Sequence, residues 1–225
     1  MNPNSYWYML AASLSGGLTG VLVMWNRTRA QDAAGFKGRH VAVSVVGTAA
    51  CVCALWAFNR AFGTRSCAYA AMVSIVTTGW AAVIQPLLTP LVPWRLLRVR
   101  AAEFVILQAR WNGVRMFGDI LRRTALRSLG GRVYLYKTGD ARAVLRGLRE
   151  AQAVHLAGLL FSCPWLAWWG VQQWWQSIAC AVAVQVPLNV YPVLHLRYVT
   201  WRVERFLAKS NLQCFCSNGR LTEAK

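Results

Sequence analysis

Long stretches without a single charged residue restrict the fold of this chain more than any other feature. Residues 6–25, 41–58 and 177–196 contain no Lys, Arg, Asp or Glu, and residues 67–94 are uncharged over their whole length. A helix that crosses a bilayer needs about 20 mostly apolar residues. Soluble domains carry charge on about a quarter of their residues, whereas this chain has 14%. The pattern predicts an all-α, polytopic membrane helix bundle.

Five segments are expected to span the membrane: 6–25, 41–58, 67–94, 155–171 and 177–196. The first lacks the basic residues that precede a cleaved signal peptide, so we expect a retained anchor. The third contains Pro86, Pro90 and Pro93. Since proline interrupts a helix, this segment is expected to span once and then leave the bilayer.

Basic residues are distributed in a way that supports this count. Segments 26–40, 95–150 and 197–225 carry most of the net charge of +18, whereas segments 59–66 and 172–176 carry little. Lys and Arg accumulate on the cytoplasmic side of membrane proteins. Five spans with an outer N-terminus place the three basic segments on that side.

The basic region predicts helices that lie in the membrane interface. Apolar residues recur every three or four positions in 102–129, namely Phe104, Leu107, Trp111, Val114, Phe117 and Leu121. This spacing marks one face of a helix, and arginines between these positions are typical of interfacial helices. A second basic helix is expected over 141–150.

We therefore expect four regions. Residues 1–94 form an N-terminal membrane region with three spans, 95–150 a basic amphipathic interfacial region, 151–206 a C-terminal helical hairpin, and 207–225 a basic tail. Five tryptophans flank the turn of the hairpin: Trp165, Trp168, Trp169, Trp174 and Trp175. Such a group is typical of the aromatic belt at a headgroup level, in preference to an aromatic core.

The seven cysteines do not predict a metal site. Cys51 and Cys53 are two residues apart, as are Cys214 and Cys216, and neither pair has the spacing of a zinc site. Unpaired thiols are the simpler interpretation, and Cys214 or Cys216 could carry an acyl chain. No metal ligand is predicted.

Polar residues at the ends of the last two spans form the candidate site. His155 begins one span, and His195, Arg197 and Tyr198 end the next. Because a short turn makes these spans antiparallel neighbours, the four side chains are expected to meet at one membrane surface. Ionisable groups at membrane depth are often functional, although each alone could be an interfacial anchor. Asn189 lies in mid-span and needs a hydrogen-bond partner there.

These residues carry a resemblance to a known family over about 149–206. The glycosyl-4,4'-diaponeurosporenoate acyltransferases, small bacterial membrane enzymes of carotenoid biosynthesis, typically show "AExxHW", an apolar hairpin, and "N-x-x-P" or "N-x-P" running into "QRYNRxR". The segment "AQAVHL" resembles the first motif, with Ala151 and His155. The segment "NVYPVLHLRYVTWR" resembles the second, with matching residues Asn189, Pro192, Arg197, Tyr198 and Arg202.

The sequence departs from this pattern at five positions. Gln152 replaces the glutamate of the first motif and Leu156 its tryptophan, while Leu196, Val199 and Thr200 replace the glutamine, asparagine and second arginine of "QRYNR". An amide at 152 can accept a hydrogen bond but cannot hold a proton, which removes any acid–base role that a carboxylate would have there.

The resemblance implies transfer of a fatty acyl group to a hydroxyl of a lipid-embedded, glycosylated isoprenoid-type acceptor. His155 would be the general base, and Arg197 and Tyr198 would stabilise the oxyanion. Gln152, Asn189, His195 and Arg202 would bind substrate. No bound cofactor is expected, and acyl-coenzyme A or an acyl-lipid would be the co-substrate.

Other functions remain open from the sequence. A non-catalytic membrane subunit or scaffold of a larger complex is the main alternative, because Gln152 and Thr200 depart from the family pattern. The expected partners are membrane lipids with anionic headgroups and subunits of such a complex. Nucleic acid, which a charge of +18 could also attract, is not expected because no soluble basic module is visible.

Overall fold

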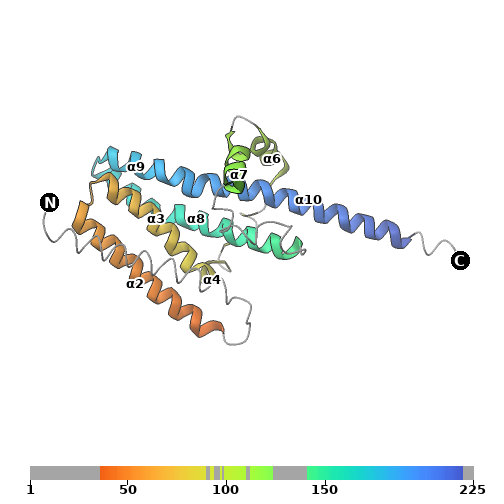
Figure 1. Ribbon diagram of the computed structural model, residues 1–225, viewed down its shortest axis with the longest axis horizontal. Coiled ribbons are helices and arrows are strands. Elements are labelled where there is room, and N and C mark those ends of the chain that lie inside the picture. Colours follow the sequence, from red (N-terminus) through yellow and green to blue (C-terminus); the bar gives the residue numbers. More distant parts are fainter. Residues whose placement is uncertain are drawn as a thin grey trace. The chain divides into compact units, whose positions relative to one another are not determined.

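The computed structural model of the chain describes residues 36–89, 92–93, 97, 99–109, 112–123 and 141–219. Figure 1 shows its helices: α2 (Phe36–Phe62), α3 (Cys67–Val83), α4 (Gln85–Leu88), α6 (Ala101–Gln108), α7 (Val114–Arg123), α8 (Ala141–Val171), α9 (Trp175–Gln185), the π-helix η4 (Val186–Val190) and α10 (Tyr191–Gly219). The described residues contain no strand. The prediction of an all-α fold is confirmed.

Among the described residues, three helical stretches are long and apolar enough to cross a membrane: His40–Phe62, Ala143–Val171 and Trp175–Ala208. They contain the predicted spans 41–58, 155–171 and 177–196. The predicted third span corresponds to α3, an apolar helix of 17 residues, and to α4, which has proline in its first turn. The predicted first span, 6–25, lies outside the described residues. The prediction of a helical membrane protein is confirmed, and the count of five spans stays a prediction.

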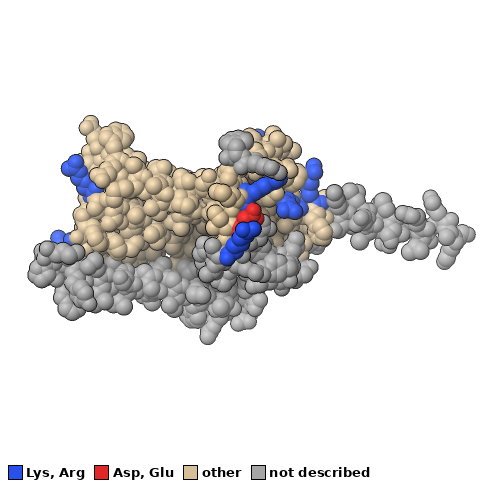
Figure 2. Space-filling view, turned by 45° about the horizontal axis from the view of Figure 1, so that its top comes forward, with Lys and Arg blue, Asp and Glu red and all other residues tan. Residues whose placement is uncertain are grey.

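The chain divides into two compact units, which we describe separately. Unit 1 consists of Met1–Pro93 and Ala153–Pro192, and unit 2 of Trp94–Gln152 and Val193–Lys225. Helices α8 and α10 each contribute residues to both units. Between 40 and 89 and between 153 and 192, the only charged side chains are those of Arg60 and Arg65. In Figure 2 most of the described surface is tan, and the blue Lys and Arg side chains gather at a few places.

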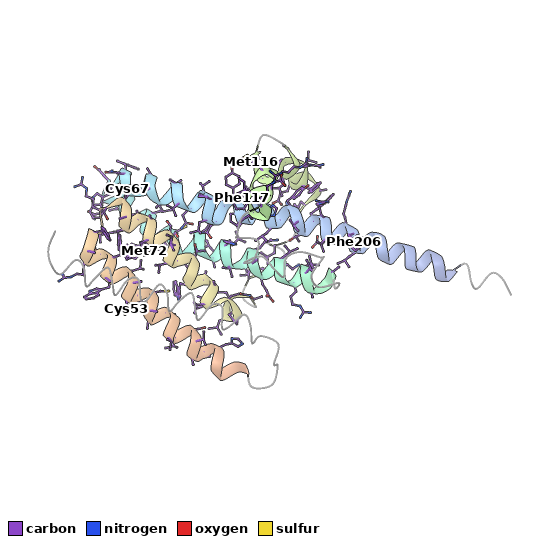
Figure 3. All side chains as sticks on the ribbon, viewed as in Figure 1. Cys53, Cys67, Met72, Met116, Phe117 and Phe206 are labelled. Carbon is purple, nitrogen blue, oxygen red and sulfur yellow. A yellow bond between two sulfur atoms is a disulfide. The ribbon has the colours of Figure 1, made fainter. Side chains whose placement is uncertain are left out.

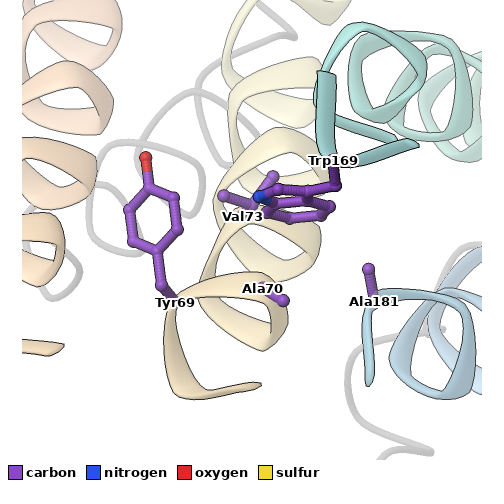
Figure 4. Close-up of a cluster of buried hydrophobic side chains, with 5 residues drawn as sticks. All are labelled: Tyr69, Ala70, Val73, Trp169 and Ala181. Carbon is purple, nitrogen blue, oxygen red and sulfur yellow. The ribbon is translucent and has the colours of Figure 1, made fainter. Parts of the chain in front are cut away.

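The core of unit 1 forms where α3, α8 and α9 come together (Figure 4). Tyr69, Ala70, Val73, Trp169 and Ala181 make one buried cluster. Trp169 has no exposed surface, and its indole N–H donates to the carbonyl of Thr64 at 3.2 Å. The predicted aromatic belt is therefore wrong for Trp169, which packs as a core residue, whereas Trp168 and Trp175 are exposed.

A disulfide joins Cys67, at the start of α3, to Cys180 on α9. The prediction of unpaired thiols is wrong for these two cysteines. The two residues are 113 positions apart in sequence, and only the packing of α3 against α9 brings them together. Cys53 and Cys163 are free thiols, as predicted. Figure 3 shows Cys67 at the α3 end that lies beside α9.

The amphipathic stretch in unit 2 is not one helix. α6 ends at Gln108 and α7 begins at Val114, so the prediction of a continuous helix over 102–129 is wrong. Gly113 has a positive φ of 71°, a conformation that glycine adopts without strain. The Asn112 side chain accepts a hydrogen bond from the backbone N–H of Val114. Together these residues end one helix and start the next.

The apolar face of this stretch is still the one that is buried. Phe104, Leu107 and Val114 pack with Val99 in a cluster that also contacts Tyr198 and Trp201 of α10. Met116 and Ile120 of α7 are exposed. A second cluster of unit 2 packs Val144 and Leu148 of α8 against Leu196 and Val203 of α10.

Candidate active site

His155 and Asn189 form a hydrogen-bonded pair in the apolar interior of unit 1. Nδ1 of His155 lies 3.0 Å from Oδ1 of Asn189. Asn189 is completely buried, and His155 is partly buried. A polar pair at this depth is costly unless its members are bonded, and in spanning helices such groups mark candidate functional sites. The structure thus places these two predicted site residues together.

The local backbone explains how Asn189 reaches this position. It lies in the π-helix η4, whose sequence is VPLNV. Pro187 has no backbone N–H and excludes the regular α-helical register. The N–H of Tyr191 bonds instead to the carbonyl of Val186, five residues earlier. Short π-helical turns within α-helices are frequent at functional sites.

The Asn189 amide has two further partners. Nδ2 donates to Oγ1 of Thr78 at 2.7 Å and to Oε1 of Gln185 at 2.5 Å. Nε2 of Gln185 bonds to Oγ of Ser162, and Ser162 also contacts Oγ1 of Thr77 at 2.9 Å. Thr77, Thr78, Ser162 and Gln185 are all buried. A connected polar network therefore runs from α3 through α8 and α9 to the imidazole.

Gly158 permits this close approach of helices. A Cβ atom at position 158 would lie 3.0 Å from Oγ1 of Thr78 and 3.2 Å from Oδ1 of Asn189. Small residues let spanning helices pack closely enough to hydrogen-bond through their side chains. The sequence analysis missed Gly158 and Thr78. Their signal was weak, because a glycine or threonine within an apolar span is common.

In unit 2, Gln152 is completely buried and bonds to Thr200. Its Nε2 donates to Oγ1 of Thr200 at 2.7 Å, and Thr200 is also completely buried. Two of the five positions that depart from the family motifs therefore contact each other. Each carries a neutral residue where the family pattern has a charged one.

Arg197 of unit 2 pairs with Glu103 of α6. Its Nε lies 2.5 Å from Oε1 of Glu103, and its Nη2 lies 2.8 Å from Oε2. The hydrogen bond from Arg197 lowers the pKa of the Glu103 carboxyl below its usual value, and the burial that opposes this shift is outweighed. Sequence reasoning missed Glu103, because a partner 94 residues away leaves no local pattern.

The other predicted residues of unit 2 are His195, Tyr198 and Arg202, and His195 and Tyr198 contact residues of α6 and α7. The Tyr198 ring stacks on Phe104 at 5.5 Å between centroids. The guanidinium carbons of Arg115 and Arg202 lie 5.9 and 5.8 Å from the Tyr198 ring centroid. The His195 ring meets Phe117 edge-on, and Gly118 leaves room for it, since a Cβ there would lie 2.3 Å from Cε1 of His195.

The seven predicted site residues thus fall into two groups. His155 and Asn189 belong to unit 1, and Gln152, His195, Arg197, Tyr198 and Arg202 belong to unit 2. That the two groups meet at one membrane surface stays a prediction. Among the residues that the structure describes, no group of three or more His, Cys, Asp or Glu side chains could hold a metal ion.

These features define a helical membrane protein with an imidazole–amide pair inside its apolar core. Its C-terminal part, residues 110–209, matches the family model of the glycosyl-4,4'-diaponeurosporenoate acyltransferases. The predicted resemblance is confirmed, and it begins earlier than the motifs at 149–206 indicated, so that it includes α7. All seven predicted site residues lie within the matched part. No curated protein matches the chain, and neither does any solved structure.

Proposed function

We propose that this protein is a membrane acyltransferase that esterifies a hydroxyl of a lipid-embedded acceptor with a fatty acyl group. The family match and the apolar helices fit a membrane acyltransferase. The observation that carries the proposal is the bonded pair of His155 and Asn189 within apolar helices. An imidazole is the side chain most often used as a general base, and this one is held in place.

The position of the pair supports an acceptor that resides in the membrane. Thr78, which binds Asn189, follows Cys67 by 11 residues in α3, or about 16 Å along a helix. His155 precedes the tryptophan-rich end of α8 at Val171 by 16 residues, or about 24 Å. A hydrocarbon core is about 30 Å thick. A reacting hydroxyl would therefore approach within the bilayer, as that of an amphipathic lipid can.

The reaction has a simple proton balance. His155 removes the proton of the acceptor hydroxyl as its oxygen attacks the acyl carbonyl carbon of the donor. The bond from this carbon to the leaving group then breaks, and the imidazolium returns the proton to the leaving group. General base catalysis of this kind contributes about 10²–10⁴-fold to a rate.

We propose that the acyl donor bears a phosphate, as acyl-coenzyme A or an acyl-phospholipid does, and two arginines of unit 2 support this proposal. Within the described residues, neither Arg115 nor Arg202 has a carboxylate partner, and both contact Tyr198. Arginine binds phosphate oxygens in pairs through its planar guanidinium. Replacing both by glutamine should raise the KM for acyl-coenzyme A at least tenfold, and Arg60→Gln in unit 1 should leave it unchanged.

Lipid analysis of cells tests the proposed activity. Cells that lack the protein should lose an acylated lipid, and expression of the wild-type chain should restore it. His155→Ala should not restore it, whereas His40→Ala should, because His40 lies in α2 and is not part of the pair. An unchanged lipid profile in cells without the protein would contradict the proposal.

One observation favours a non-catalytic subunit instead. The double hydrogen bond to Glu103 neutralises Arg197, which the family resemblance gives a role on the oxyanion. A subunit would purify from mild detergent with a partner in fixed ratio, and would show no acyl turnover with or without that partner. Turnover by the isolated chain would exclude this alternative.

A further inference from the structure

The hydrogen bonds around His155 have a fixed direction, and two hydroxyl groups determine it. Thr78 donates its proton to the backbone carbonyl of Ser74 at 2.9 Å, and Ser162 donates its proton to that of Gly158 at 2.8 Å. A hydroxyl has only one proton to donate. With these protons so placed, Thr78 accepts from Asn189 and Ser162 accepts from Gln185.

This condition orients both buried amides. Gln185 must point its NH₂ group at Ser162, which leaves its carbonyl oxygen facing Asn189. Asn189 must in turn point its own NH₂ group at Gln185 and Thr78, because both atoms it meets there are acceptors. Both amide protons of Asn189 are then used, and only its carbonyl oxygen can face His155.

A carbonyl oxygen carries no proton, so the proton in the bond between Oδ1 of Asn189 and Nδ1 of His155 must belong to His155. We infer that Asn189 is a positioning residue that holds neutral His155 as the tautomer protonated on Nδ1, which leaves the lone pair on Nε2. The hydrogen bond at one ring nitrogen decides which nitrogen carries the proton. The tautomer follows from the hydrogen bonds of Thr78, Ser162, Gln185 and Asn189 described above, and its use in catalysis rests on the proposed function.

This inference changes the role expected for Asn189. The family resemblance implies substrate binding, but both amide protons and the carbonyl oxygen of Asn189 already bond to protein groups. It orients the imidazole as a carboxylate or an asparagine does in other nucleophile–histidine sites. Because it is an amide, it fixes the ring without adding a negative charge to the membrane interior.

Nitrogen NMR of the imidazole rings tests the tautomer without any substrate. The full chain, labelled with ¹⁵N-histidine and reconstituted in lipid nanodiscs, contains only three histidines, and loss of one signal in His155→Gln assigns His155. Spectra are recorded about two units above the ordinary histidine pKa of about 6.5. We expect Nδ1 of His155 to show the shift of a protonated nitrogen and Nε2 that of an unprotonated one.

Two variants separate orientation from folding. Asn189→Leu removes the acceptor and should move the proton of His155 to Nε2 in most molecules, with the His195 signals unchanged. Asn189→Asp keeps an oxygen at the same place, so Nδ1 should stay protonated. If Asn189→Leu does not fold, the wild-type and Asn189→Asp spectra still show which ring nitrogen of His155 carries the proton. An Nε2-protonated ring in the wild type, or unchanged His155 signals in a folded Asn189→Leu protein, would overturn the inference.

The spectra and the lipid assay can fail independently. A wild-type ring protonated on Nδ1 together with full activity of His155→Ala would retain the tautomer and reject the proposed function. A ring protonated on Nε2 together with loss of activity in His155→Ala would do the reverse. If the tautomer and the proposed function both hold, Asn189→Asp should retain more activity than Asn189→Leu, and the two variants should have the same KM for the acyl donor.

Discussion

Nε2 of Gln152 lies 2.7 Å from Oγ1 of Thr200, and neither residue has any exposed surface. The family motifs have glutamate and arginine at these positions. A buried carboxylate and guanidinium would stabilise each other, and loss of one alone would leave the other unpaired. Both charges are absent here, and a neutral hydrogen bond occupies the site. Because the residue that contacts position 152 is also neutral, the loss of the glutamate does not by itself argue against catalysis.

A double-mutant cycle at these two positions tests this relationship. Gln152→Glu alone should destabilise the protein by about 3–5 kcal/mol, since it buries an unpaired charge. Thr200→Arg alone should cost a similar amount, from charge and from overpacking. The double variant should recover on the order of 1–3 kcal/mol relative to the sum of the single changes. Thermal unfolding in detergent measures all three, and strict additivity would refute the pairing.

The ion pair of Glu103 and Arg197 should make stability depend on pH. The hydrogen bond from Arg197 lowers the pKa of Glu103 in the folded protein below its ordinary value of about 4.5. The stability from this pair is therefore fully present above about pH 4.5 and is lost as the pH falls through the lower folded pKa. Glu103→Gln should remove about 1–2 kcal/mol at neutral pH and flatten the acid limb of the stability curve.

Glu204→Gln is the matched control for this experiment. Glu204 makes a single ion pair with Arg149 at 3.1 Å, and both side chains are more than a quarter exposed. Exposed pairs contribute about 0–1 kcal/mol, so this variant should change stability little. Identical acid unfolding of Glu103→Gln and the wild type would show that Glu103 has no such role.

Gly158→Ala should disturb the site without changing any polar group. The added methyl would lie 3.2 Å from both Oδ1 of Asn189 and the Cα atom of Thr78, and the backbone cannot easily yield. We expect a loss of about 1–3 kcal/mol and reduced acyl transfer. Gly170→Ala on the same helix meets nothing within 4 Å and should be neutral or slightly stabilising. Equal effects of the two variants would contradict the packing described here.

The Cys67–Cys180 disulfide gives a test of membrane orientation. Disulfides persist in oxidising compartments, and the predicted topology places the segments 59–66 and 172–176 on the non-cytoplasmic side. An impermeant thiol reagent added to intact cells should label the chain at these two cysteines only after an impermeant reductant. The Cys67→Ser/Cys180→Ser variant should show no such gain. If labelling required disruption of the membrane, the orientation would be the opposite of the predicted one.

Much of the fold could be predicted because charge and hydropathy are local properties of the sequence. The uncharged runs identified α2, α8 and the α9–α10 stretch as spanning segments, and the spacing of Phe104, Leu107 and Val114 identified the buried face of α6 and α7. The break between these two helices also had a local signal, the Asn112-Gly113 pair, which favours a turn.

The missed features depend on tertiary contacts. The partners of Arg197 and Cys67 are 94 and 113 residues away, and no spacing rule connects them. His155 and Asn189 were both predicted as site residues, yet only the packing of α3 against η4 brings Thr78 to the Asn189 amide and so orients that amide. Trp169 was assigned to a belt because composition alone does not show which of five neighbouring tryptophans faces inward.

The rate of acyl transfer by the purified chain in lipid vesicles tests the central claim most directly. With palmitoyl-coenzyme A as donor and a glycosylated isoprenoid lipid as acceptor, mass spectrometry of the ester gives kcat for each variant. We predict that His155→Ala lowers kcat by about 10²–10⁴-fold while His40→Ala retains the wild-type rate. A His155→Ala protein that forms the ester as fast as the wild type would contradict the account.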